Sequence, residues 1–118
     1  PLHIDFIEVS SYGDSTESTG NVRIVKDFKH PVTDSHVLIV EDIIDTGLTF
    51  DFLFDHIRLK QPASLEIAAL LVRKSVDRKK RPIKYAGFEI GEEFVVGYGL
   101  DAAGLYRNLN HIAAYSPT

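Results

Sequence analysis

The chain has 118 residues, of which 44% are hydrophobic and 25% charged, with a formal net charge of −4 at pH 7. These values are those of one ordinary globular domain, residues 1–118, and they provide no general basic surface for nucleic acid or an anionic membrane. No apolar run is long enough to span a bilayer, and the absence of cysteine excludes disulfides and thiol chemistry, which fits a cytoplasmic protein.

The amino-terminal part predicts a β-hairpin. Residues 2–10 and 22–26 alternate apolar and polar side chains, which is the pattern of strands. Between them, residues 11–21 are mainly Ser, Thr, Gly, Asp and Glu, and they predict a loop. A connection that contains Pro31 then leads to a strand at 36–40.

The middle of the chain predicts a strand–helix–strand unit. Residues 49–60 place apolar side chains near helical spacing, with Thr46 or Thr49 as a candidate amino-terminal cap. Residues 65–72 form a second continuous apolar strand, which we expect to pair in parallel with strand 36–40 through a right-handed crossover. The predicted fold class is therefore α/β.

The carboxyl-terminal part predicts shorter elements. The basic run Arg-Lys-Lys-Arg at 78–81 is most simply a solvated loop and not a nucleic-acid site. After this loop we expect strands at 84–90, 94–98 and 112–115, a turn or close backbone approach at Gly97 and Gly99, and a helical turn at 101–106.

The segment VLIVEDIIDTGLT, residues 37–49, carries most of the functional information. An apolar strand runs into Glu41 and Asp42, and Asp45 precedes a hydroxyl-rich turn around Gly47. Ligands of open α/β sheets bind at this end of the strands. Backbone amides and hydroxyls of the turn suit a phosphate monoester, whereas Glu41 and Asp42 repel phosphate and suit sugar hydroxyls or Mg²⁺. A sugar phosphate fits both halves; the alternative is an ordinary loop in which Asp or Thr caps the helix.

This segment resembles the phosphoribosyl pyrophosphate signature of the phosphoribosyltransferases. Three further segments resemble the hypoxanthine-guanine branch: DFIEVSSYG (5–13), GFEIGEEFVVGYGLD (87–101) and YRNLNHI (106–112). The resemblance implies a type I phosphoribosyltransferase fold, with a central parallel sheet flanked by helices and a flexible antiparallel hairpin lid. Members of the family are longer, so we expect this chain to correspond to their carboxyl-terminal two-thirds, without the amino-terminal part and its pyrophosphate loop.

The function implied by the resemblance is purine salvage in the cytoplasm. The reaction would transfer 5-phosphoribosyl from phosphoribosyl pyrophosphate to hypoxanthine or guanine, with Mg²⁺, giving IMP or GMP and pyrophosphate. A homodimer or homotetramer is expected on the same ground. Two alternatives remain open: a non-catalytic nucleotide-binding or regulatory domain, and a phosphoribosyltransferase that prefers xanthine.

The resemblance also implies residue roles in the sugar-phosphate and base sites. Asp45 would exchange a proton with the purine N7, although an Asx-turn is its alternative role. Phe94 would stack on the purine and the Val95 backbone would read the base edge, where core packing is the alternative for Phe94. The predicted sugar-phosphate residues are Glu41, Asp42, Ile43, Ile44, Asp45, Thr46, Gly47, Leu48 and Thr49.

The remaining implied roles concern pyrophosphate, metal, base and lid. The predicted metal ligands are Glu41, Asp42 and Asp101. Arg107 would bind pyrophosphate, with a surface ion pair to Asp101 as the alternative. Arg73 stands where the family usually has a lysine that donates to the exocyclic oxygen of the purine, and either Arg73 or Lys74 can donate here. Ser11 and Tyr12 would form the tip of a lid that excludes water.

Overall fold

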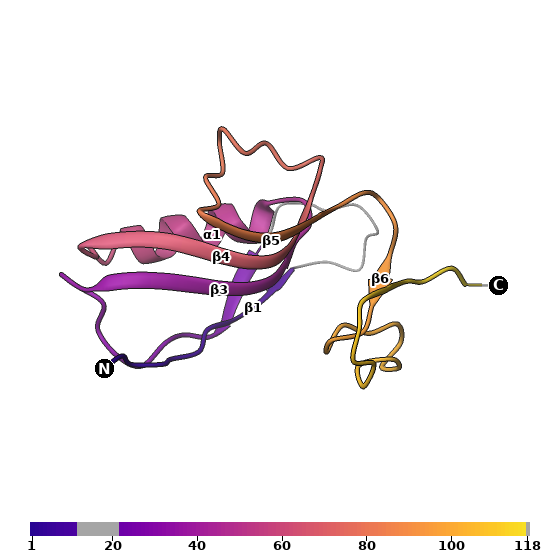
Figure 1. Cartoon of the computed structure of the whole chain (residues 1–118). Coiled ribbons are helices and arrows are strands. Elements are labelled where there is room, and N and C mark those ends of the chain that lie inside the picture. The colour runs from indigo at the N-terminus through magenta and orange to yellow at the C-terminus, as the bar shows by residue number, and fades with distance from the viewer. Residues whose placement is uncertain (12–21, 118) are drawn as a thin grey trace.

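The structure, a computed structural model, describes residues 1–11 and 22–117. Within these residues, Figure 1 shows a central sheet with one helix behind it and a small carboxyl-terminal segment beyond the sheet. No helix in this part of the chain is long and apolar enough to cross a membrane. The elements are β1 (Glu8–Ser11), β2 (Val22–Lys26), β3 (His36–Ile44), α1 (Leu48–Arg58), β4 (Ser64–Arg73), β5 (Tyr85–Ile90), β6 (Val95–Val96) and β7 (Ala113–Ala114).

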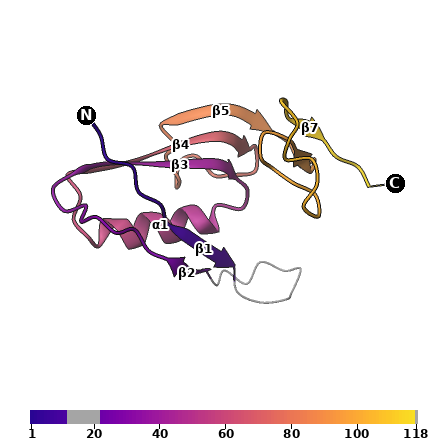
Figure 2. The ribbon, with the colours of Figure 1, turned by 90° about the horizontal axis from the view of Figure 1, so that it is seen from below.

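The central sheet has the strand order β3-β4-β5, and all three strands are parallel. Figure 2 shows α1 along one face of this sheet and the hairpin β1–β2 beside the helix. Leu53 of α1 and Ile67 and Val72 of β4 are buried in the core between helix and sheet. The predicted strand–helix–strand unit and its parallel pairing are confirmed.

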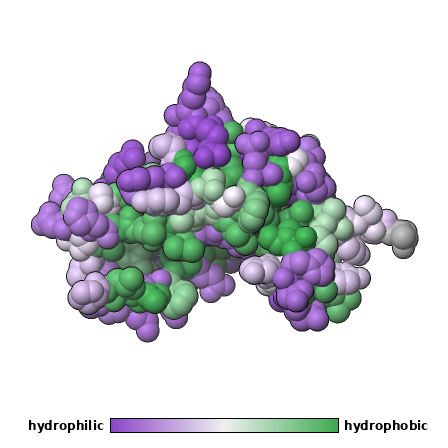
Figure 3. All heavy atoms as spheres, viewed as in Figure 1, coloured by the Kyte–Doolittle hydropathy of each residue, from purple (hydrophilic) through white to green (hydrophobic). Residues whose placement is uncertain are grey.

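The opposite face of the sheet stays exposed in the described part of the chain. Leu38, Val40 and Tyr85, which the register places on this face, expose half of their surface or more, and Figure 3 shows hydrophobic side chains gathered over β3 and β4. A continuous apolar run such as that of β3 is typical of a parallel strand covered on both faces. From Val37 to Ile43 only every second residue is shielded, with Ile39 fully buried, because α1 covers a single face; Ile44, at the end of the strand, is buried as well.

Strand β3 is four residues longer than the sequence predicted. Its ladder with β4 continues past Val40, through Glu41↔Ala69 and Ile43↔Leu71 to Ile44↔Val72. The two acids that the sequence suggested for a loop therefore lie at the carboxyl end of a strand. Backbone pairing, which does not depend on side-chain polarity, keeps them there.

The helix is close to its predicted position, but neither threonine caps it. Gly47 occupies the cap position with φ +88°, and no side-chain cap is formed. At the other end, Gln61 adopts φ +56° and its amide bonds the Arg58 carbonyl, which terminates the helix.

The hairpin is confirmed, although its first strand begins later than expected. β1 and β2 pair antiparallel with Val9 opposite Ile24, whereas residues 2–7 form no strand. Asp5 organises this segment because its carboxylate accepts bonds from the backbone amide and ring of His30 and from the Lys29 and Phe6 amides. These bonds, chiefly those from His30, hold the pKa of Asp5 well below its usual range.

The carboxyl-terminal segment lies beyond the carboxyl ends of β3, β4 and β5 (Figure 1). β6 and β7 pair antiparallel, and Gly97 makes the predicted close approach, because a Cβ there would collide with the His111 carbonyl oxygen. The helical turn predicted at 101–106 is wrong. Ala102 and Leu105 bond each other across a two-residue hairpin turn, which places Ala103 and Gly104 at positive φ.

Candidate active site

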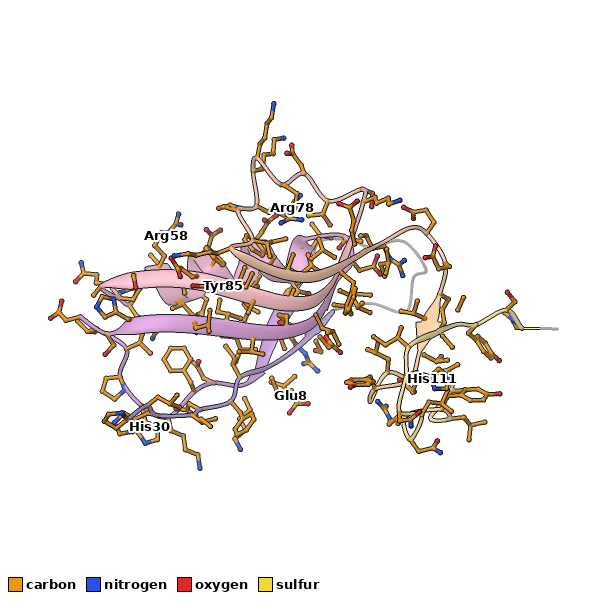
Figure 4. All side chains as sticks on the ribbon, viewed as in Figure 1. Glu8, His30, Arg58, Arg78, Tyr85 and His111 are labelled. Atoms are coloured by element: carbon orange, nitrogen blue, oxygen red, sulfur yellow. The ribbon has the colours of Figure 1, made fainter. Side chains whose placement is uncertain are left out.

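A cavity of about 440 Å³ opens between the hairpin and the carboxyl end of β3. Ile7, Glu8 and Val9 line its hairpin side, where Figure 4 labels Glu8. Residues 41–47, Thr49 and Phe50 line the other side. Of the nine residues predicted to bind the sugar phosphate, the structure brings eight to one cavity, and only Leu48, the first residue of α1, is not part of the lining. The volume lies within the usual range for small-molecule sites.

The turn at Gly47 leaves backbone amides without hydrogen-bond acceptors at the amino-terminal end of helix α1. The first intrahelical bond runs from the Asp51 amide to the Gly47 carbonyl at 2.9 Å, and the Leu48 amide makes a long bond of 3.3 Å to Thr46 Oγ1. The amides of Gly47, Thr49 and Phe50 have no acceptor among the described residues. Unpaired amides at a positive helix end can form an anion site, and apart from the long Thr46 bond no side chain occupies these donors among the described residues.

The paired acids at the end of β3 have different environments. Glu41 is partly buried, and this burial, followed by the charge of Asp42, raises the pKa of Glu41 to about 7. The Asp42 carboxylate is exposed and accepts a bond of 2.7 Å from the Ile43 amide. Near neutral pH the pair therefore carries less than two full charges, and it offers both a donor and acceptors to sugar hydroxyls.

Asp45 and Arg73 face each other across neighbouring strand ends. Arg73 Nε donates to Asp45 Oδ1 at 2.7 Å, and Arg73 Nη1 donates to the carbonyls of Gly91 and Glu93 at 2.6 and 2.9 Å. Arg73 is buried, with 8% of its surface exposed, whereas Asp45 is exposed. Asp45 makes no Asx-turn bond among the described residues. Of the two candidate donors to the purine, Arg73, and not the exposed Lys74, adjoins Asp45.

Phe94 follows directly after the loop that Arg73 holds. Its ring is 53% exposed and contacts Tyr115 edge-on, with centroids 6.1 Å apart, so the core-packing alternative for Phe94 is wrong. Val95, the next residue, is buried in β6. An exposed aromatic ring at the same end of the sheet as Asp45 is a suitable surface for a flat base.

Asp101 and Arg107 lie together in the carboxyl-terminal segment. Arg107 Nη2 is 3.2 Å from Asp101 Oδ1, Arg107 Nη1 donates to the Gly99 carbonyl at 2.7 Å, and the Gly104 amide donates to Asp101 Oδ2 at 2.7 Å. The ion pair that the sequence offered as an alternative is therefore present. Neither residue lines the cavity, and no three His, Cys, Asp or Glu side chains of the described residues gather as a metal site.

Two site features lay outside the sequence prediction. Glu8, an exposed residue of β1, lines the cavity from the hairpin side. Arg81, predicted to be solvated, forms two bonds to Asp51 in the first turn of α1 and lies against Gly47. Figure 4 shows Arg78 of the same basic loop, which stands above the sheet. Tyr12 and the Ser11 side chain, predicted for the lid, lie outside the described residues.

Comparison with known proteins decides the family. A model of the phosphoribosyl transferase domain matches residues 1–103. The chain belongs to the phosphoribosyltransferase family. It is 47% identical over 112 residues to a hypoxanthine phosphoribosyltransferase of Haemophilus influenzae, covering 95% of this chain and 63% of that protein. It is 45% identical over 116 residues to a hypoxanthine-guanine phosphoribosyltransferase of Bacillus subtilis, covering 98% and 64%.

A solved structure agrees with this phosphoribosyltransferase assignment. A crystal structure of a hypoxanthine phosphoribosyltransferase from Staphylococcus aureus superposes with a TM-score of 0.90 and 44% sequence identity, covering 99% of this chain and 64% of that chain. The resemblance found in the sequence and the type I phosphoribosyltransferase fold are therefore confirmed. The chain spans slightly less than two-thirds of the length of the relatives it matches.

Proposed function

We propose that this chain carries the sugar-phosphate and base sites of an enzyme that transfers 5-phosphoribosyl from phosphoribosyl pyrophosphate to hypoxanthine or guanine. The observation that carries the proposal is one cavity whose lining includes the Gly47 turn, the Glu41–Asp42 pair and Asp45. The names of the relatives support the choice of substrates. The products are IMP or GMP and pyrophosphate.

The turn at Gly47 binds the 5′-phosphate in this proposal. The amides of Gly47, Thr49 and Phe50 donate to its oxygens, and the hydroxyls of Thr46 and Thr49 complete the site. Glu41 and Asp42, which belong to the last four residues of β3, then meet the ribose hydroxyls.

Asp45 acts on the base. The purine N9 attacks the anomeric carbon, the bond from that carbon to the pyrophosphate oxygen breaks with its electron pair, and the N7 proton passes to the Asp45 carboxylate. Arg73 holds Asp45 Oδ1, while Oδ2 has no donor among the described residues and is available for that proton. The remaining Arg73 nitrogen, Nη2, also lacks an acceptor among the described residues and can donate to the exocyclic oxygen of the purine.

Phe94 and Val95 complete the base site. The exposed Phe94 ring stacks on the purine, and the Val95 backbone reads its edge. Because Arg73 bonds the carbonyls of Gly91 and Glu93, it places this aromatic wall relative to Asp45. Arg73 therefore serves the base site in two ways, as a donor and as a brace.

The pyrophosphate requires neutralisation of charge. The oxygens of Glu41 and Asp42 fit Mg²⁺, which favours one or two carboxylates plus substrate phosphates and needs no closed protein cage. When bound, Mg²⁺ supplies charge stabilisation on the leaving pyrophosphate. Asp101 is a further ligand in this proposal, and Arg107 binds pyrophosphate oxygens. A cytoplasmic homodimer or homotetramer remains part of the proposal.

The test is nucleotide formation by the protein that carries this chain. Hypoxanthine, guanine and xanthine are each supplied with phosphoribosyl pyrophosphate and Mg²⁺. We expect turnover of hypoxanthine or guanine, and a fall of roughly 10²- to 10⁴-fold in Asp45→Asn. Turnover of xanthine alone would support the xanthine-preferring alternative, and nucleotide binding without turnover of any base would support a non-catalytic domain.

A further inference from the structure

The basic loop between β4 and β5 reaches back to the phosphate turn through one side chain. Arg81 Nε donates to Asp51 Oδ1 at 2.8 Å and Arg81 Nη2 donates to Asp51 Oδ2 at 2.7 Å. Only 18% of the Arg81 side chain is exposed, and its backbone amide is fixed by a bond of 2.9 Å to the Asp77 carbonyl. Two parallel bonds of this kind hold a guanidinium in a defined orientation.

Asp51 creates an electrostatic problem that Arg81 can solve. Asp51 lies in the first turn of α1, where a carboxylate stabilises the helix by interacting with its dipole. The Asp51 amide makes the first intrahelical bond. Its carboxylate therefore belongs to the residue directly after Thr49 and Phe50, whose amides have no acceptor among the described residues. An unpaired negative charge at this position opposes the binding of a phosphate dianion to those amides.

Arg81 also supports the turn itself. A Cβ at Gly47 would lie 2.6 Å from Arg81 Cδ and 2.7 Å from Arg81 Cζ, so the guanidinium end of the side chain packs directly on the Gly47 Cα. Neither Arg81 nor Asp51 is among the residues that line the cavity. The pair therefore contacts the turn without lining the cavity.

We propose that Arg81 is a positioning residue for the phosphate site, which cancels the charge of Asp51 and fixes the Gly47 turn without touching the ligand. The inference rests on the proposed function and adds a residue to it. It predicts that loss of Arg81 weakens the binding of ligands that carry a phosphate more than the binding of ligands that lack one. A pair that only braces the fold would affect both alike.

The experiment compares IMP with inosine, which is the same nucleoside without the phosphate. Affinities are measured by isothermal titration calorimetry on the protein that carries this chain, as wild type and as Arg81→Ala, Asp51→Asn and the double variant. Lys80→Ala is the matched control, since it removes one exposed positive charge from the same loop. Thermal melts establish that each variant is folded.

We expect Arg81→Ala to weaken IMP by roughly three- to tenfold, the effect of one uncompensated charge near a helix end. The affinity for inosine should change by less than about twofold. The double variant, in which Asp51→Asn is added to Arg81→Ala, should regain the IMP affinity of the wild type, and Lys80→Ala should bind IMP as tightly as the wild type. Should Arg81→Ala fail to fold, Asp51→Asn alone must bind IMP at least as tightly as the wild type. Equal losses for IMP and inosine, no loss, or no restoration would overturn the role of Arg81. A wild type that binds IMP no better than inosine would overturn the phosphate site together with it.

Discussion

Replacing Gly47 by alanine perturbs both the backbone and the packing of the phosphate turn. At φ +88°, alanine takes on a left-handed conformation that costs about 1–2 kcal/mol. Its Cβ also collides with the Arg81 side chain, whose far end is held by Asp51. Moving Arg81 away sacrifices a partly exposed ion pair, worth up to about 1 kcal/mol. We expect a total destabilisation of roughly 1–3 kcal/mol.

Gly104→Ala is the matched control for Gly47→Ala. Gly104 has a similar φ of +81°, but no atom lies within 4 Å of the position that its Cβ would take. It therefore reports the backbone strain alone. The excess cost of Gly47→Ala over Gly104→Ala measures the Arg81 contact, and this excess should disappear when Gly47→Ala is made in an Arg81→Ala background.

Thermal unfolding followed by circular dichroism makes the comparison. In a domain of this size about 1 kcal/mol corresponds to a Tm shift of about 4–8 °C, so Gly47→Ala should lower Tm by roughly 5–20 °C. If Gly47→Ala and Gly104→Ala cost the same, or if the excess persists without Arg81, then Arg81 is not the reason for glycine at the turn.

Three further substitutions test the base site and the acidic pair. Arg73→Ala should lower the free energy of unfolding, measured in urea, by about 2–4 kcal/mol, because the carbonyls that Arg73 bonds lose their donor. It should also weaken the binding of hypoxanthine; unchanged affinity would remove Arg73 from the site. Phe94→Ala should weaken IMP by roughly 5- to 150-fold with little change in Tm, whereas Phe88→Ala, an exposed ring on β5, should not; equal effects would contradict stacking. The pKa of Glu41 is raised from 4.5 to about 7, so the folded protein keeps the Glu41 proton at pH values where the unfolded chain loses it. Without divalent cations, the free energy of unfolding should therefore fall by about 1–3 kcal/mol as pH rises from 4.5 to 7, and Glu41→Gln should lack this loss. Identical pH–stability curves for the wild type and Glu41→Gln would contradict the raised pKa.

The sequence alone predicted the helix and strands whose formation follows from the local spacing of apolar residues. The helical spacing of the apolar residues placed α1 to within two residues at each end, and the run before Glu41 identified β3. The last four residues of β3 were not predicted as strand, because they are extended through pairing with β4 and two of them are acidic residues that the sequence suggested for a loop. The hairpin turn at Ala103 was missed because a non-glycine residue at φ +50° gives no local signal.

The site divides in the same way. The segment 41–49 is contiguous, so its motif alone was enough to place Asp45 and the Gly47 turn together. Arg81 meets Asp51 across 30 residues of sequence, and Arg73 meets the Glu93 carbonyl across 20, through a loop path that no spacing rule specifies. These tertiary contacts, rather than the motif, decide which charges are paired.

A crystal structure of the protein with bound IMP is the most direct test of the phosphate site. The 5′-phosphate should accept hydrogen bonds, at about 2.7–3.2 Å, from the amides of Gly47, Thr49 and Phe50, with the ribose hydroxyls toward Glu41 and Asp42. A phosphate bound instead to the exposed cations of the basic loop, with those amides still lacking an acceptor, would contradict the assignment of this turn.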